Sequence, residues 1–157
     1  MAENKVKQET GNIPAELLDG VKLNDFLAFN DFIKSSKLSK STTNKAKTSW
    51  AIKYKGKLIC YLRIGKNTWS ISYFKNRELL EQIEIYLSDE LKKIILNNIN
   101  TKPGCPNCKG NENRVVLGKK FDRVCGCHLF VLRNPEEQIF ECAKELILVC
   151  KKAIDEL

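Results

Sequence analysis

The chain of 157 residues is poor in the groups on which much enzyme chemistry depends. Its single histidine, His128, excludes a two-histidine metalloprotease motif, and it has neither a Gly-x-Ser-x-Gly elbow nor a glycine-rich phosphate loop. Paired acids such as Glu136 and Glu137 stand where helix faces or caps use them. We therefore assign no catalytic residue and expect a binding role rather than an enzyme.

Long apolar runs are also lacking. No segment approaches the roughly 20 apolar residues of a membrane span, and the polar stretch from Met1 to Asn12 does not have the apolar part of a signal peptide. We expect a cytoplasmic protein with no membrane span. The cysteine count of seven is odd, so in a reducing compartment the thiols are free, metal-bound or redox-active rather than a disulfide framework.

Negative charge is missing from the middle of the chain. The net charge of +8 falls on residues 1–75, which carry 14 Lys/Arg and 6 Asp/Glu, and no acidic residue occurs between Asp31 and Glu78. A positive surface of this kind attracts nucleic acid, anionic lipid or a phosphorylated ligand. The alternative is that the lysines only keep the protein soluble.

Residues 49–74 show the alternation of a β-sheet. Three runs with a period of two are separated by turns at Lys55-Gly56 and at Gly65-Lys66-Asn67, which predicts a three-stranded antiparallel meander. One face of this meander is apolar and aromatic. The other is expected to show Lys53, Lys55, Tyr61, Arg63, Ser70 and Ser72.

Helical spacing surrounds the meander. A helix is predicted over residues 23–33 with Asn24 as its cap, followed by a mobile Ser/Thr/Lys loop over residues 34–45. Two further helices meet at Ser88, a residue type that caps helices. Short strands are predicted at residues 114–117 and 128–132, and Asn134 is the predicted cap of a helix that runs close to the C-terminus.

This order predicts an α+β fold, with an antiparallel sheet made of the meander plus a C-terminal strand pair, and with helices packed on one face. The predicted organisation is a flexible segment, 1–20, and a single domain, 21–157, that contains a cysteine-rich loop, 102–128. The C-terminal helix and the meander strand carry Cys60, Cys142 and Cys150 at apolar positions, which indicates core packing.

The chain resembles a loose group of small uncharacterised bacterial proteins that contain a domain of unknown function. The resemblance covers about residues 24 to 154. It depends on Trp50-x-Ile-x-Tyr54-x-Gly-Lys57, on a meander through Trp69, on Gly118-Lys119-x-Phe121 and on Asn134-Pro135-Glu136. It implies the fold and brings no activity with it.

Four cysteines within 23 residues form the sharpest chemical motif of the chain. Cys105 and Cys108 have the spacing of a zinc knuckle, and Cys125 with Cys127 follows after 16 residues, so two thiolate pairs could complete a tetrahedral Zn²⁺ site. His128 is an alternative fourth ligand. Two other interpretations stay open: unligated thiols, or a redox pair at Cys105 and Cys108 whose pKa is lowered by neighbouring lysines.

Two binding hypotheses follow. In the first, nucleic acid or another polyanion binds the basic face of the meander, with Tyr61 as a stacking surface and Lys53, Lys55, Lys57 and Arg63 at phosphates. In the second, a sensor-like pocket holds a small hydrophobic, aromatic or cationic molecule; the alternative for its rings is a plain core. The predicted pocket residues are Trp50, Tyr54, Trp69 and Tyr73.

Overall fold

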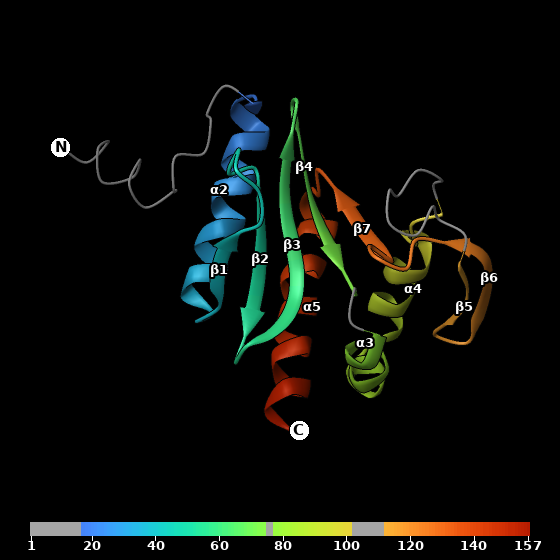
Figure 1. The fold of residues 1–157 in the computed structure, drawn as a ribbon. Helices are drawn as coiled ribbons and strands as arrows, with labels where there is room; N and C mark the ends of the chain where they lie inside the picture. Colours follow the sequence, from blue (N-terminus) through green and yellow to red (C-terminus); the bar gives the residue numbers. More distant parts are fainter. Residues whose placement is uncertain (1–16, 75–76, 102–111) are drawn as a thin grey trace.

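The computed structural model describes residues 17–74, 77–101 and 112–157 (Figure 1). No helix within these ranges combines the length and the apolar character that crossing a bilayer requires. In chain order the elements are α2 (Gly20–Ser35), β1 (Ser39–Thr42), β2 (Ser49–Tyr54), β3 (Lys57–Gly65), β4 (Thr68–Tyr73), α3 (Arg77–Ile83), η2 (Glu84–Tyr86), α4 (Asp89–Asn97), β5 (Glu112–Val116), β6 (Lys119–Val124), β7 (Phe130–Arg133) and α5 (Glu137–Asp155).

Five strands form one antiparallel sheet in the order β1-β2-β3-β4-β7, while β5 pairs with β6 in a second, two-stranded sheet. The predicted α+β class and the predicted meander, β2 to β4, are both confirmed. Lys55 and Gly56 join β2 to β3 with positive φ values of 48° and 78°. Such a two-residue turn matches the twist of a hairpin, and glycine adopts its second position without steric cost.

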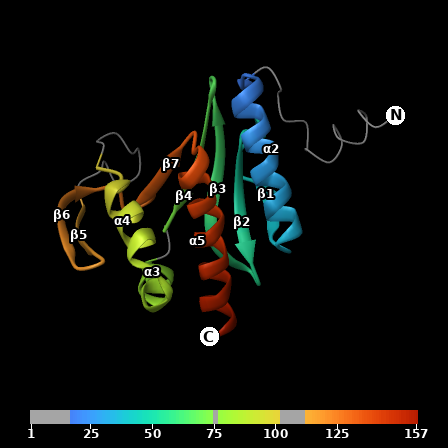
Figure 2. The same cartoon turned by 180° about the vertical axis from the view of Figure 1, so that it is seen from behind.

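Two helices cover one face of the large sheet. Figure 2 shows α2 and α5 in front of the sheet, and Figure 1, from the opposite side, shows β1 to β4 with no described helix over them. Phe26 and Phe29 of α2 pack on Trp69 with ring centroids 5.6 and 5.8 Å away. The Tyr73 hydroxyl donates to the Ala143 carbonyl of α5 at 2.9 Å. The core therefore lies between the sheet and these helices, and no described helix covers the opposite face of β1 to β4.

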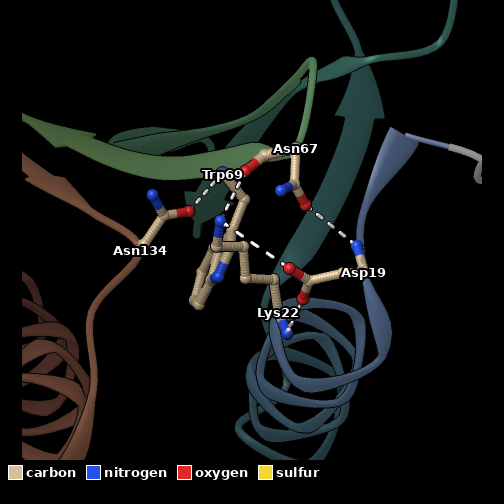
Figure 3. Close-up of polar contacts among 5 residues, drawn as sticks. All are labelled: Asp19, Lys22, Asn67, Trp69 and Asn134. Carbon is tan, nitrogen blue, oxygen red and sulfur yellow. Dashed lines mark hydrogen bonds and ion pairs between the residues drawn. The ribbon is translucent and has the colours of Figure 1, made fainter.

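The start of α2 is bound to the β3–β4 hairpin (Figure 3). Asp19 caps the helix by accepting from the Lys22 amide at 3.0 Å, so the predicted cap Asn24 is wrong; it lies inside the helix. The Asp19 amide donates to Asn67 Oδ1 at 3.0 Å, and Lys22 Nζ donates to the Asn67 carbonyl at 2.9 Å. Because Leu18 is also buried, the packed part of the chain begins before the predicted boundary at residue 20.

The predicted cap of the C-terminal helix, Asn134, is also wrong. Asn134 has a positive φ of 43°, and its side-chain Oδ1 accepts from the Trp69 amide of β4 at 2.9 Å (Figure 3). Its own backbone amide donates to the Trp69 carbonyl at 2.8 Å. Glu136 takes the cap position, without a side-chain hydrogen bond, and α5 starts at Glu137. The asparagine was expected to satisfy a helix end, and instead it satisfies the end of a strand.

The predicted mobile loop over residues 34–45 contains strand β1, which pairs with β2 at the edge of the sheet. Lys40 of β1 points to the helix side, where its Nζ donates to Asn30 Oδ1 at 2.5 Å and lies 5.1 Å from the centre of the Trp50 ring. Burial, together with the charge of Lys34, lowers the Lys40 pKa. A short edge strand with an inward lysine is a poor template for pairing with another sheet edge.

The C-terminal strands pair differently from the prediction. The segment at 114–117 does form a strand, β5, but its partner is β6, which the sequence did not indicate. Leu117 and Gly118 both have positive φ and form the two-residue turn of a hairpin, so β5 pairs with the strand that follows it directly in the chain. The strand predicted at 128–132 is β7, and it extends the large sheet by pairing with β4.

The helices after the meander follow the predicted division. Ser88 caps α4, as expected, by accepting from the Leu91 amide at 3.2 Å. Asp89 and Glu90 occupy the first turn of α4, where the helix dipole favours negative charge. After α4, residues 98–101 run beside β7, with a bridge between Ile99 and Phe130.

Candidate nucleic-acid interface

The sheet face opposite the helices is polar and basic. We call it the open face; its outward positions follow from the alternation of the strands and from the residues that pack on α2 and α5. The five strands of the large sheet contain no aspartate or glutamate. Positive charge on this face is therefore not cancelled within the sheet. Its main side chains, of which Ser49 and Ser72 are buried by their neighbours, are Ser49, Lys53, Tyr61, Arg63, Ser70, Ser72 and Arg133.

Two arginines lie in one cross-strand row. Ser49 pairs with Arg63, Arg63 pairs with Ser70, and Ser70 pairs with Arg133. Because neighbouring strands are about 4.8 Å apart, the Cα atoms of Arg63 and Arg133 are separated by roughly 10 Å. Both side chains are exposed, and the Arg133 side chain has no hydrogen bond or ion pair to a described residue. The row thus offers two separate guanidinium groups to an extended anion.

A ring cluster adjoins this row. His128 contacts the open face, where its Nε2 is 3.0 Å from an Arg63 guanidinium nitrogen and its Nδ1 is 2.8 Å from the Ser72 hydroxyl. The His128 and Tyr61 rings meet edge to face, with centroids 5.8 Å apart, and the Arg63 guanidinium lies 5.9 Å from the Tyr61 ring centre. The cluster holds Arg63 in place and leaves Tyr61 half-buried.

The five residues predicted to bind nucleic acid have different surroundings. Lys53, Lys57 and Arg63 are exposed and Tyr61 is half-buried. Lys55 is instead part of an ion pair with a carboxylate of α5, described below. The structure brings Tyr61 and Arg63 together on the open face, and it adds two residues that sequence reasoning did not assign to this site, which are Arg133 and His128. The charge pattern could not indicate Arg133, because it lies in the balanced second half of the chain.

Lys55 is bound to the C-terminal end of α5. Its Nζ lies 2.5 Å from Asp155 Oδ1, and the Tyr54 hydroxyl donates to the same carboxylate at 2.9 Å. The hydrogen bond from Lys55 lowers the pKa of Asp155, and the bond to Asp155 raises the pKa of Lys55. Within the described part of the chain, Lys55 is thus the one predicted lysine whose charge is paired with a carboxylate.

Two hollows flank the arginine row. One, of about 350 Å³, is lined by the loop between β1 and β2 and by Arg63. The other, of about 280 Å³, is lined by residues 97–101 together with Val131 and Arg133. Each hollow contains one arginine of the row, so a ligand that crosses the strands reaches a recess at both ends.

The predicted metal ligands divide between described and undescribed residues. Cys105 and Cys108 lie outside the described residues. Cys125 is buried and Cys127 half-buried, and the His128 amide donates to Cys125 Sγ at 3.3 Å. Such a bond favours a thiolate. Within the described ranges no group of three or more His, Cys, Asp or Glu side chains could hold a metal, so a site here would need both outlying cysteines.

The Glu112 carboxylate lies close to the backbone of Gly126, between Cys125 and Cys127. A methyl group built on Gly126 would lie 2.4 Å from the Glu112 carboxylate, so only glycine permits this approach without a shift of Glu112. His128 has both ring nitrogens within hydrogen-bond distance of Arg63 and Ser72. Metal binding by His128 would have to break one of these contacts, which favours the four-cysteine ligand set over the set with histidine.

The four rings of the predicted pocket lie mainly in the core. Trp50, Trp69 and Tyr73 are 1–2% exposed, and Tyr54 is half-buried beside α5. They face the helices, on the side of the sheet away from the open face. Phe26 fills the space beside both tryptophans, with ring centroids 5.8 and 5.6 Å away. This packing agrees with the plain-core alternative.

The remaining cysteines are buried as expected for core packing. Cys60 and Cys150 lie between β3 and α5 with at most 1% exposure, and Cys142 is also buried. Burial raises the pKa of the Cys150 thiol to about 12 and raises that of Cys60 well above its ordinary value, with Cys150 adding to the rise at Cys60. These thiols are protonated at neutral pH and therefore poor nucleophiles.

Comparison with protein-family models, with curated proteins and with solved structures finds no match to this chain.

Proposed function

We propose that the open face binds single-stranded nucleic acid. The observation that carries this proposal is the row in which Arg63 and Arg133 flank Ser70 on a sheet face without a carboxylate in its strands. Guanidinium groups bind phosphate oxygens through paired hydrogen bonds, and they keep their charge at any physiological pH. Two such groups about 10 Å apart suit an extended polyanion better than a compact anion.

The rings beside the row favour an unpaired strand. Proteins that bind single strands combine a basic groove with aromatic side chains on which bases stack, at about 1–3 kcal/mol per base. Tyr61 and His128 offer such rings next to Arg63. In a duplex the bases are already stacked on each other, so the rings would add little there.

Fluorescence anisotropy with a labelled single-stranded oligonucleotide tests the proposal. The wild-type protein should bind at low salt, and Arg63→Gln should weaken binding several-fold. Lys152→Gln is the matched control, because it removes one exposed charge from α5 on the opposite side of the sheet. If the wild-type protein does not bind, or if Arg63→Gln and Lys152→Gln lose the same affinity, the open face is not the binding surface.

We also propose a structural Zn²⁺ site formed by Cys105, Cys108, Cys125 and Cys127. The specific support is the hydrogen bond from the His128 amide to Cys125 Sγ, since backbone amides that donate to sulfur stabilise the thiolates that zinc binds. Zinc would then anchor the segment that carries His128 onto the sheet.

Elemental mass spectrometry on untagged protein purified without chelator tests the zinc site. We expect about one zinc per chain, lost when Cys125 and Cys127 are both changed to serine. A metal-free protein whose cysteines cycle reversibly between dithiol and disulfide would favour the redox alternative instead.

A further inference from the structure

The hollow beside Arg63 has the chemistry of an anion site. We call it the hydroxyl hollow; it has a volume of about 350 Å³ and opens at the end of the arginine row. Its walls come from the β1–β2 loop and from the adjacent part of β3. The lining residues are Thr43, Asn44, Thr48, Ser49, Arg63 and Ile64.

The hydrogen bonds of the loop orient one hydroxyl as a donor. The Thr48 amide donates to Asn44 Oδ1 at 3.0 Å, which fixes the orientation of the Asn44 side-chain amide. Asn44 Nδ2 therefore faces Thr48 Oγ1, at 2.9 Å, and donates to it. Since this hydroxyl oxygen accepts, its own hydrogen remains to be donated to a ligand.

Further donors complete the hollow. Thr43 Oγ1 and Ser49 Oγ are 2.7 Å apart, and a bond between two hydroxyls uses one hydrogen and leaves the other. The Arg63 guanidinium has five N–H groups, and the hydrogen-bond partner of this group among the described residues is His128. The hollow therefore presents two hydroxyl donors and a guanidinium group.

The β1–β2 loop is also positively charged and held by internal hydrogen bonds, and both properties favour binding of an anion in the hydroxyl hollow. The loop carries Lys45 and Lys47, and no carboxylate occurs in the chain between Asp31 and Glu78. The Lys47 amide donates to the Asn44 carbonyl, so the loop is closed by a turn as well as by the side-chain bonds. A site that is already ordered loses less entropy when a ligand binds.

We propose that the hydroxyl hollow binds a terminal phosphomonoester of a nucleic-acid strand, an inference that rests on the proposed function of the open face. The hollow lies where the cross-strand row Arg133–Ser70–Arg63–Ser49 reaches the β1 edge of the sheet, so the end of a bound strand falls there. A terminal phosphate carries more negative charge than an internal diester and has three acceptor oxygens to match the donors.

The test compares three oligonucleotides of one sequence, about ten nucleotides long, with a 5′-phosphate, a 3′-phosphate or no terminal phosphate, by fluorescence anisotropy. We expect one of the phosphorylated strands to bind on the order of tenfold more tightly than the strand without phosphate, the size expected for hydrogen bonds to a charged group. Thr48→Val, which removes the oriented hydroxyl donor and lies outside the open-face row, should reduce this difference and leave the unphosphorylated strand unaffected. Thr42→Val is the matched control, because Thr42 pairs with the core residue Trp50 and faces the helix side.

The outcomes separate the two proposals. Equal affinity for all three strands would overturn the phosphate site while the nucleic-acid function stands. If no strand binds, titration with inorganic phosphate and with a nucleoside monophosphate decides the site: shifts of the Thr48 and Ser49 amide signals in ¹⁵N NMR would support a phosphate site on a protein that does not bind nucleic acid. Unmoved signals would overturn both proposals.

Discussion

The salt dependence of binding measures how many phosphates the arginine row neutralises. On a single strand, each phosphate that a protein neutralises contributes about 0.7 to the slope of log affinity against log salt concentration. Arg63 and Arg133 stand far enough apart to contact different phosphates. Replacing both with glutamine should therefore lower the slope by about 1.4.

This change in slope corresponds to a measurable change in affinity. When salt rises fourfold, from about 50 to 200 mM, the wild-type affinity should fall about sevenfold more than that of the double variant. Anisotropy titrations of one labelled oligonucleotide at four or more salt concentrations give both slopes. Thermal melts of each protein by circular dichroism show that folding is unchanged, which matters because Arg63 also contacts His128 and Tyr61.

Two results would refute the reasoning. A double variant with the wild-type slope would mean that the arginines do not contact phosphates. A Lys152→Gln variant with the same loss of slope would mean that net charge, rather than the open face, determines binding. We expect the Lys152→Gln line to run parallel to that of the wild type.

Three further predictions follow from single contacts. Lys53→Gln should weaken oligonucleotide binding more than Lys55→Gln in anisotropy titrations, because the charge of Lys55 is already paired with α5; equal losses would argue against this distinction. Tyr73→Phe should lower the free energy of unfolding in urea by about 1 kcal/mol through the lost hydrogen bond to α5, and an unchanged midpoint would contradict it. Cys60 and Cys150 should react with an aromatic disulfide reagent only after denaturation, because both thiols are buried and protonated. Mass spectrometry locates the labelled cysteines, and fast labelling in the native protein would show that these thiols are accessible.

Local patterns accounted for much of the fold. Alternating side chains predict β2, β3 and β4 because a strand turns every second residue to the same face. Ser88 was predictable as a cap because its partner, the Leu91 amide, is only three residues away. β1 was not predicted because its four residues, Ser-Lys-Ser-Thr, show no alternation of apolar and polar side chains. They form a strand only by pairing with β2.

The candidate site was less predictable, because its parts come from distant places in the sequence. Tyr61 and Arg63 share a face by strand alternation, so the sequence alone determined that pair. His128 contacts Arg63 across 65 residues, and Arg133 joins the row only because β7 pairs with β4.

Contacts with residues distant in the sequence also gave Asn134 and Lys55 roles that differ from those their local sequence predicts. Asn134 hydrogen-bonds Trp69, 65 residues away, instead of capping the helix that follows it, and Lys55 pairs with Asp155 across 100 residues. Composition and periodicity determined that this chain would build a basic antiparallel sheet. Only the tertiary structure decided which charges face solvent unpaired, because strand order and helix docking set the neighbours of each side chain.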